Sequence, residues 1–397
     1  MSVQMYDMGF GESILLDSLN CPYCVGPCEQ KTECLLVDCG SGHPNRNRYF
    51  DNVSNEVRQY IRRSALISHF HDDHINGFWT LINNNVTFER VFIPQIFTTP
   101  HPNIIDYSLM RNILSRRRGR QATFSLWQML QTLVSNNNRI YLLKRGDIFN
   151  AVQERFEVLW PVPELLCDQN LMNSIEKGLQ LPEDIVFSIF DISDDISSLF
   201  SRLDNNLVIM REDYEKVIAR INDSLASLLA TVVELEINDR DIDKYIKKMR
   251  DCENKMSIVC HSDYSGQPVL LTGDVTRAVL SKILSNRYVP SMPVYEHYAV
   301  IKAPHHGTCT YFVDITKYNV SVDTIGISNG NPNTPCGPIS DRYWNTICGV
   351  DFNTEIRCTN MDANRCRCFN TRLNACSQHH RCLYGGFHRN SSGIELL

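Results

Sequence analysis

The stretch SHFHDDHINGF (residues 68–78) decides the fold, and it follows an apolar run, 65–67, that predicts a strand. Four of its side chains, within six residues, are of metal-ligand types: His69, His71, Asp73 and His74. On a loop these imidazoles and this carboxylate can converge on a cation, whereas on a regular helix or strand they would point apart. A solvated polar turn is the alternative interpretation, but this density of zinc-type ligands favours a metal site.

The composition is that of an ordinary globular protein. The 397 residues are 43% hydrophobic and 21% charged, which is enough for one large or two medium domains around a sizeable core. The formal net charge of −6 excludes a global positive field that would attract nucleic acid. A polyanionic substrate would therefore be met by a local basic patch.

The sequence predicts neither a signal peptide nor a membrane span. Residues 1–7 lack a basic segment followed by an apolar one, and no apolar run approaches the roughly 20 residues that span a bilayer. We therefore expect a cytoplasmic protein without a membrane partner. In that compartment the 16 cysteines are expected to be reduced thiols or metal ligands rather than a disulfide framework.

Apolar patterns divide the chain into two strand-rich parts separated by a helical part. Short apolar runs predict strands at 13–16, 35–37, 65–67, 90–93, 140–143, 156–159, 257–262, 269–272, 299–302 and 324–328. A helical pattern covers 55–63, and a longer, acidic one runs from about 182 to 250. Beyond residue 348 the chain is rich in Cys, Asn, Arg and His, and we expect it to be irregular.

The long helical part carries one apolar face. Its apolar residues recur at three- and four-residue steps: Tyr214, Val217, Ile221, Leu225, Leu228 and Val232. This pattern predicts a helical hairpin. The hairpin either packs simply as core or serves as a lid or a dimerisation arm.

The histidine-rich stretch resembles the HxHxDH signature of the metallo-β-lactamase superfamily, and two later motifs agree with it. LTGD (271–274) resembles the second aspartate motif of that family, and APHHGT (303–308) resembles its late histidine motif. One branch fits best, the hydrolase domain of bacterial competence (DNA-uptake channel) proteins. Its landmarks are similar to four segments in the same order: MGFGES (8–13), LVDCG (36–40), NKMSIV (254–259) and PHHGT (304–308). The resemblance covers residues 1–165 and 254–340.

This resemblance implies an α/β fold, the αββα sandwich of the metallo-β-lactamases. The expected catalytic domain comprises 1–165 and 254–347, interrupted by a helical insertion at 166–253 and followed by a Cys/His-rich segment at 348–397. A complete DNA-uptake channel would carry its own membrane helices, so a stand-alone relative of its hydrolase domain is expected.

The resemblance also implies a dinuclear metal site. Its ligands would be His69 and His71 for the first metal, Asp73, His74 and His306 for the second, and Asp274 between the two. Two divalent cations can share and acidify one hydroxide and clamp the reacting oxygens. Adjacent side chains on extended backbone point apart, so His305 is expected to meet the scissile group and protonate the leaving oxygen.

The first metal site is short of a ligand. Many dinuclear members add a histidine between the early motif and Asp274, but only His101 and His261 lie in that interval. Neither is expected to ligate, because a lone histidine is usually a surface or core residue. The expected cofactor is therefore one or two Zn²⁺, with Mn²⁺ as the alternative. Asp38 is either a carboxylate that fixes the tautomer of a ligating imidazole or a turn residue at a strand end.

Two groups of cysteines are candidates for structural zinc, with free thiols as the alternative. The first begins with a CxxC motif: Cys21, Cys24, Cys28 and Cys34. The second is Cys358, Cys366, Cys368, Cys376 and Cys382, near His379, His380 and His388. A zinc ion would suit the second segment, which lacks the apolar residues to fold unaided.

A basic run stands out on this acidic chain: Arg111, Arg116, Arg117, Arg118 and Arg120. It is either a phosphate-binding patch, with the predicted contacts at Arg116, Arg117 and Arg118, or a solvated helix end.

Three functions compete. The competence-type motifs, the paired histidines and the arginine run favour a phosphodiesterase or nuclease. A hydrolase of a lactam, thioester or peptide bond would share the metals and differ in its pocket. An effector of a multiprotein complex, for example in defence, would bind a partner or self-associate through the helical insertion and be active only when assembled.

Overall fold

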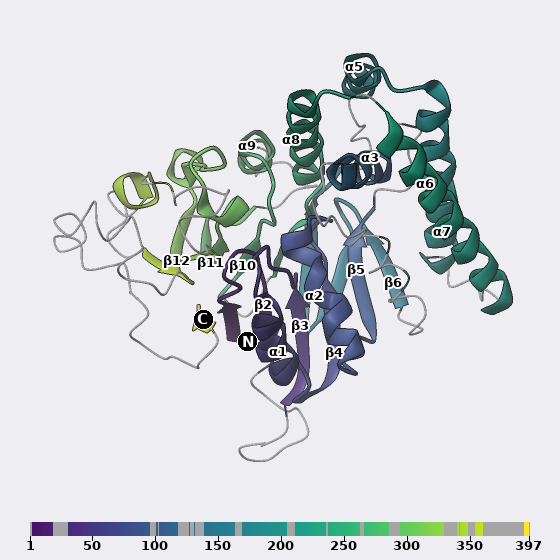
Figure 1. The fold of residues 1–397 in the computed structure, drawn as a ribbon. Helices are drawn as coiled ribbons and strands as arrows, with labels where there is room; N and C mark the ends of the chain where they lie inside the picture. Colours follow the sequence, from purple (N-terminus) through teal and green to yellow (C-terminus); the bar gives the residue numbers. More distant parts are fainter. Residues whose placement is uncertain are drawn as a thin grey trace.

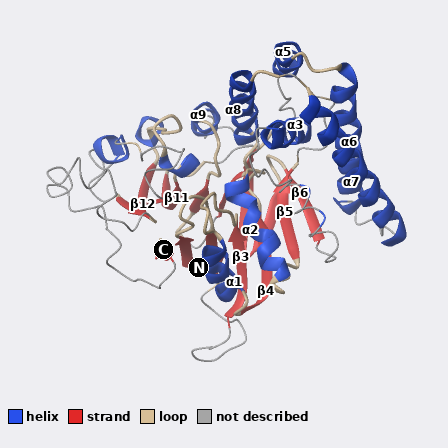
Figure 2. Cartoon of the chain, in the orientation of Figure 1, coloured by secondary structure: helices blue, strands red, loops and turns tan. Residues whose placement is uncertain are grey.

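Two β-sheets pack face to face, and helices cover their outer faces (Figures 1 and 2). The computed structural model describes residues 2–18, 31–95, 101, 103–117, 127, 131, 139–162, 169–204, 211–235, 237–262, 266–285, 294–328, 340, 342–347, 354–359 and 393–396. This mixed α/β architecture with two sheets agrees with the predicted one.

The first sheet has the strand order β14-β1-β2-β3-β4-β5-β6. Its strands are β1 (Ser2–Tyr6), β2 (Ile14–Asp17), β3 (Lys31–Val37), β4 (Tyr60–Leu66), β5 (Arg90–Pro94), β6 (Arg139–Leu143) and β14 (Gly393–Glu395). Strands β3 to β6 are parallel, whereas β14, β1, β2 and β3 pair antiparallel.

The second sheet has the order β13-β12-β11-β10-β9-β8-β7. Its strands are β7 (Ile148–Ala151), β8 (Glu154–Trp160), β9 (Val259–Ser262), β10 (Val269–Leu271), β11 (His297–Lys302), β12 (Ser321–Ile327) and β13 (Glu355–Cys358). Strands β10 to β13 are parallel. Both sheets therefore contain a parallel part whose carboxyl ends can carry functional side chains.

Strand β3 shows how the layers are held together. Leu35 and Val37 pack in the core between the two sheets, whereas Cys34 and Leu36 pack in the core beneath the helices. Successive side chains of a strand point to opposite faces, so the continuous apolar run CLLV fills both cores.

Most helices cover the outer face of the first sheet. These are α1 (Asn47–Val57), α2 (Asp72–Asn83), α3 (Ile104–Arg117), α5 (Gln169–Leu179), α6 (Glu183–Asp204), α7 (Arg211–Glu234) and α8 (Asp239–Lys255). The second sheet is covered by α9 (Arg277–Ser285), the 3₁₀ turns η1 (Pro304–Gly307) and η2 (Ile315–Tyr318), and the π-helical turn η3 (Tyr343–Ile347). In the part of the chain that the structure describes, no helix combines the length and the apolar composition that crossing a bilayer requires.

The predicted apolar face of the insertion lies inside the molecule. Ile221, Leu225, Leu228 and Val232 of α7 are buried in the same core as the outer face of the first sheet. Helix α6 packs against α7, and α8 packs against α3 (Figure 1). These contacts agree with the interpretation that the insertion packs as core.

Three secondary-structure predictions were wrong or incomplete. The helix expected at 55–63 ends at Val57, because Tyr60 begins β4 and pairs with Lys31 of β3. The segment beyond 348, expected to be irregular, contributes β13 beside β12 and β14 beside β1. Helix α3 was not predicted. It is buried on every side along residues 103–115, so it has no polar face to reveal a helical period.

Candidate metal centre

The predicted ligands meet at the carboxyl ends of strands from both sheets. The strands that deliver these side chains are β3 for Asp38, β4 for His69, β10 for Asp274 and β11 for His306. Because β3 and β4 are parallel neighbours, as are β10 and β11, their carboxyl ends lie side by side. One edge of the sandwich thus gathers segments that are far apart in the sequence.

The early histidine motif runs from a loop into a helix, not along a loop as predicted. His71 caps α2 in an extended conformation, and Asp73 and His74 lie in its first turn. Acidic side chains are favoured there by the helix dipole. The backbone N–H of His74 donates to the carbonyl of His71 at 3.0 Å, and the turn sets the ring of His74 4.2 Å from the ring of His69, centroid to centroid.

Two of these rings are oriented by one buried carboxylate. Nδ1 of His74 lies 2.8 Å from Oδ2 of Asp38, and the Ser68 hydroxyl donates to the same oxygen at 2.6 Å. Having donated its proton, the Ser68 oxygen accepts from Nδ1 of His69 at 3.0 Å. Both imidazoles therefore carry a proton on Nδ1 and turn Nε2 toward the site, where a bound cation would take its lone pair. This arrangement favours the tautomer-fixing role for Asp38 over a simple turn residue.

His306 is oriented in the same way. Its Nδ1 lies 2.8 Å from the carbonyl oxygen of Ser328, and its Nε2 lies 3.4 Å from Oδ2 of Asp73 and 3.7 Å from Oδ2 of Asp274. This nitrogen faces both carboxylates, which favours His306 over His305 as the ligand.

His305 and His306 lie on a left-handed turn, with φ of 46° and 56°, and the extended backbone expected here is wrong. Both rings consequently turn toward Asp274, and Nε2 of His305 lies 3.9 Å from its Oδ2. His305 stacks on Tyr311 with centroids 3.9 Å apart, and its Nδ1 lies 3.0 Å from the Thr308 hydroxyl. Its side chain keeps 20% exposure, more than the other histidines of the centre, so solvent can reach it. Burial lowers its pKa to about 4, which leaves the ring neutral at pH 7.

His71 is oriented by a partner from the insertion. Its Nε2 lies 2.9 Å from Oε2 of Glu253 in α8, and its ring lies 4.5 Å from that of His69. Arg111 of α3 holds the same carboxylate with two nitrogens, at 2.7 and 3.2 Å. All three side chains are buried. Burial opposes ionisation of Glu253, but Arg111 and then His71 lower its pKa to about 2.

A buried lysine, Lys302, binds the carboxylate oxygen of Asp274 that does not face the histidines. The Lys302 ammonium donates to Oε2 of Glu12 at 2.6 Å, to Oδ1 of Asp274 at 3.1 Å and to the carbonyl of Gly273 at 2.7 Å. All three of its protons therefore have acceptors. Because Oδ1 is engaged, Asp274 presents Oδ2 to the histidines. Burial would lower the pKa of Lys302, but Glu12 and Asp274 raise it above the usual value.

The site keeps its carboxylates ionised. Burial alone would raise the pKa of Asp73, but His306 and His74 hold it well below the usual range. In the same way, His74 and Lys302 lower the pKa of Asp274. The charged partners Asp274 and Asp38 outweigh burial at His74 and raise its pKa. Buried anions beside imidazoles are the donor set that a divalent cation prefers.

Three overlapping groups of ligand atoms could hold a metal ion, with the ligand atoms of each group within 4.8 Å of one another. One consists of Glu12, Asp38 and His74 and lies among the side chains that orient the predicted ligands. The other two are His69, His74 and Asp274, and Asp73, His74 and His306. Nε2 of His69 is buried without a hydrogen-bond partner among the described residues, as expected of a nitrogen that holds a cation. His71 belongs to none of these groups and adjoins them through its ring contact with His69.

Neither His101 nor His261, the two candidates between the early motif and Asp274, supplies the ligand that the first site lacks. His101 lies between Asp106 and Asp194, with one ring nitrogen on each, and stacks on Phe190 of α6. His261 is buried on the outer face of the second sheet, where Nδ1 meets the hydroxyl of Tyr298.

The cysteine and arginine predictions fall partly on described residues. Cys34 is buried in the core beneath the helices, and Cys358 lies half-buried at the end of β13. Arg111 is buried on Glu253, so it belongs neither to a phosphate patch nor to a solvated helix end. Arg116 is half-buried near the end of α3, and only the backbone of Arg117 is described. The other candidates lie outside the described residues: Cys21, Cys24, Cys28, Cys366, Cys368, Cys376, Cys382, Arg118 and Arg120.

Three charged residues of the site were missed from the sequence. Glu12 lies within MGFGES, Lys302 directly precedes APHHGT and Glu253 directly precedes NKMSIV. The sequence did contain a signal for Lys302. This lysine ends the apolar run YAVI (298–301), and a lysine in a buried strand is expected to have a charged partner.

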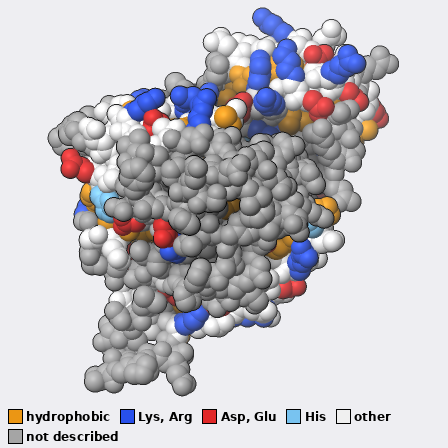
Figure 3. All heavy atoms as spheres, turned by 90° about the vertical axis from the view of Figure 1, so that its left-hand side faces the viewer, with side chains coloured by type: hydrophobic (Ala, Val, Ile, Leu, Met, Phe, Trp, Pro, Cys, Tyr) orange, Lys and Arg blue, Asp and Glu red, His pale blue; other side chains and the backbone are white. Residues whose placement is uncertain are grey.

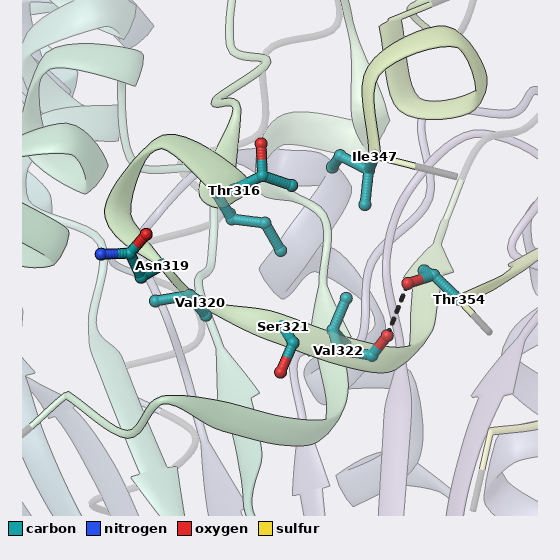
Figure 4. Close-up of a pocket in the computed structure, with 8 residues that line it drawn as sticks. Thr316, Asn319, Val320, Ser321, Val322, Ile347 and Thr354 are labelled. Atoms are coloured by element: carbon teal, nitrogen blue, oxygen red, sulfur yellow. Dashed lines mark hydrogen bonds between the residues drawn. The ribbon is translucent and has the colours of Figure 1, made fainter. Parts of the chain in front are cut away.

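A small hollow of about 170 Å³ lies elsewhere (Figure 4). It is lined by Ile315, Thr316, Asn319, Val320, Ser321, Val322, Ile347 and Thr354. Ser321 begins β12, whereas Ser328 of the metal centre follows its end, roughly 20 Å away at about 3.3 Å per residue. No lining residue is titratable, so the hollow is separate from the candidate chemistry.

Comparison with known proteins gives a loose likeness among solved structures. No family model matches the sequence, and no curated protein matches it significantly. Among solved structures, the chain is similar to the metallo-beta-lactamase fold protein YhfI from Bacillus subtilis. The similarity covers 90% of this chain and 97% of that one, at 10% identity and a TM-score of 0.40, and it is too loose to carry an argument about function.

Proposed function

We propose that this protein is a metal-dependent hydrolase of the metallo-β-lactamase superfamily. One observation carries the proposal: three histidines and two aspartates from both sheets converge, a fourth histidine adjoins them, and each of the four rings has one nitrogen at a partner outside the cluster. Such outward partners fix the tautomer and orientation of metal-ligating histidines.

The proposed ligand assignment follows the resemblance of the motifs. His69 and His71 would hold the first cation, Asp73, His74 and His306 would hold the second, and Asp274 would be shared between them. When bound, Zn²⁺ or Mn²⁺ supplies Lewis acidity and lowers the pKa of water from about 15.7 toward 7.

Other residues orient the ligands and meet the substrate. Asp38 and Lys302 keep His74 and Asp274 in place. His305, stacked on Tyr311, could exchange a hydrogen bond with the leaving oxygen through Nε2.

We propose a phosphodiester, most simply a nucleic acid, as the substrate. Supporting this, exposed basic side chains follow one another along α8: Lys244, Lys247, Lys248 and Arg250. Figure 3 shows Lys and Arg side chains along the upper edge of one face, at the height of α8 and α9 in Figure 1. Because Glu253 of α8 contacts the metal centre, these charges lie on the helix that borders it. The half-buried Arg116 remains a proposed phosphate contact.

The experiment is a cleavage assay with the purified, metal-analysed protein. Single- and double-stranded DNA and RNA are offered with added Zn²⁺ or Mn²⁺, beside a chromogenic β-lactam, a thioester and a peptide. We expect phosphodiester cleavage that a chelator abolishes and added metal restores. Turnover of another substrate alone would reassign the bond, and a protein that binds no divalent cation would overturn the hydrolase proposal. Cleavage only with a partner added would favour the effector interpretation.

A further inference from the structure

We infer that Glu253 is a positioning residue that makes the helical insertion an integral part of the metal centre. The inference rests on the proposed function, since it concerns how His71 is presented to the first cation. Glu253 belongs to α8, 182 residues from His71, and their side chains meet at 2.9 Å with Glu253 fully buried.

The contact decides which nitrogen of His71 keeps a lone pair for a cation. An ionised carboxylate only accepts hydrogen bonds, so Nε2 of His71 carries the proton and Nδ1 keeps its lone pair. The other three rings have the opposite arrangement, with Nδ1 turned outward. Glu253 therefore gives His71 alone the tautomer in which Nδ1 is the donor atom to the cation.

Arg111 holds Glu253 in the required orientation. Its planar guanidinium donates to both carboxylate oxygens, Nε to Oε2 and Nη2 to Oε1. Oε2 thus accepts from Arg111 and from His71 together. The two hydrogen bonds from Arg111 would be enough to hold α3 against α8. The third hydrogen bond, from His71 to Glu253, connects this ion pair to the proposed metal ligand.

The link has a consequence for the insertion. If α8 moves away from α3, Glu253 leaves His71, and the first cation loses an oriented ligand. Occupancy of the first metal site therefore depends on the docking of the insertion.

The test compares two double variants that differ in one acceptor. Arg111→Met/Glu253→Met replaces the buried ion pair by apolar side chains of similar volume, a change that proteins often tolerate. Arg111→Met/Glu253→Gln restores an oxygen opposite Nε2 of His71. Glu234→Met, at an exposed carboxylate of α7, is the control for the chemical change.

Three measurements are made on each folded protein: the ring-nitrogen chemical shifts of His71 without metal, the stoichiometry and affinity for Mn²⁺ and Zn²⁺, and the melting temperature. We expect the Met/Met variant to lose the Nε2–H form of His71 and to bind the first cation about 10- to 100-fold more weakly. The Gln variant should recover most of both, and Glu234→Met should match the wild type.

An unchanged tautomer and unchanged metal affinity in the Met/Met variant would overturn the inference and leave the hydrolase proposal standing. If the Met/Met variant fails to fold, the Arg111→Met/Glu253→Gln variant is compared with the wild type instead. Complete loss of the first metal site in that variant, although it keeps an acceptor for His71, would contradict the inference. If the wild-type protein bound no divalent cation, the proposed function itself would be contradicted.

Discussion

Asp38→Asn is the sharpest perturbation of the metal centre, because it removes one charge without changing the shape of the site. Asp38 has φ of 55°, a left-handed conformation that asparagine tolerates better than most residues, so no backbone strain is added. The carboxylate accepts three hydrogen bonds, from Ser68 N at 2.7 Å, Ser68 Oγ at 2.6 Å and His74 Nδ1 at 2.8 Å.

The amide cannot accept all three. With its oxygen on the Ser68 backbone N–H, its NH₂ group faces Nδ1 of His74 and donates to it. The proton of that ring then moves to Nε2, the atom that lies 3.2 Å from Asp274 and that would hold the cation. With the amide reversed, NH₂ meets the Ser68 N–H, and a buried donor is left without an acceptor.

The expected loss is large enough to measure in either case. Removing such an outer partner typically costs about 10- to 100-fold in metal affinity, which is about 1.4–2.7 kcal/mol. A buried unsatisfied donor adds about 1–3 kcal/mol of lost folding stability in the metal-free protein.

Competition with a chromogenic chelator measures the metal affinity, and urea unfolding of the metal-free protein separates the two losses. Asp323→Asn is the matched control, because that carboxylate is 61% exposed and pairs only with the exposed His297 among the contacts described. Metal affinity within threefold of wild type in a folded Asp38→Asn protein would refute the reasoning.

Three further predictions concern separate parts of the molecule. Asp73→Ala should reduce metal-dependent DNA cleavage by more than about 100-fold, since losing even an outer partner costs 10- to 100-fold, and residual cleavage within tenfold of wild type would contradict its role. Lys302→Met leaves Glu12 and Asp274 without their cation and should cost about 3–5 kcal/mol in urea unfolding of the metal-free protein, so a loss below about 1 kcal/mol would argue against the buried pair. Burial lowers the pKa of His261 to about 4, so its neutral form stabilises the fold fully above its ordinary pKa of 6.5, and this stabilisation is lost as pH falls from 6.5 toward 4. Over that range the unfolding free energy of wild type should fall by on the order of 3 kcal/mol more than that of His261→Gln, and parallel pH profiles would exclude this contribution.

The parts of the site that could be predicted are those encoded locally. His69, Asp274 and His306 each follow a short apolar run within a few residues, so strand and ligand can be read together. Their convergence needs only that parallel strands end at the same edge. Asp38 could be predicted for the same reason, because it directly follows β3.

The parts that could not be predicted depend on long-range pairing. In the sequence, Glu253 looks like any acidic residue of a helix, and its role follows only from the packing of α8 on α3. Helix α3 itself shows no amphipathic period, because it is buried on all sides. The left-handed turn at His305 and His306 could not be predicted either. Histidine does not signal positive φ as glycine does, and the turn is imposed by its surroundings.

The pairing of β1 with β14 bears on how the chain is made. Gln4 lies opposite Glu395, and Leu396 is buried in the core between the sheets. At about 5–20 residues per second, a ribosome needs roughly 20–80 s to deliver the second partner after the first. During that interval the edge of β1 that later pairs with β14 has no hydrogen-bonding partner strand. Newly synthesised chains could therefore pair with one another through this edge. A chaperone that covers β1 would then raise the yield of active protein.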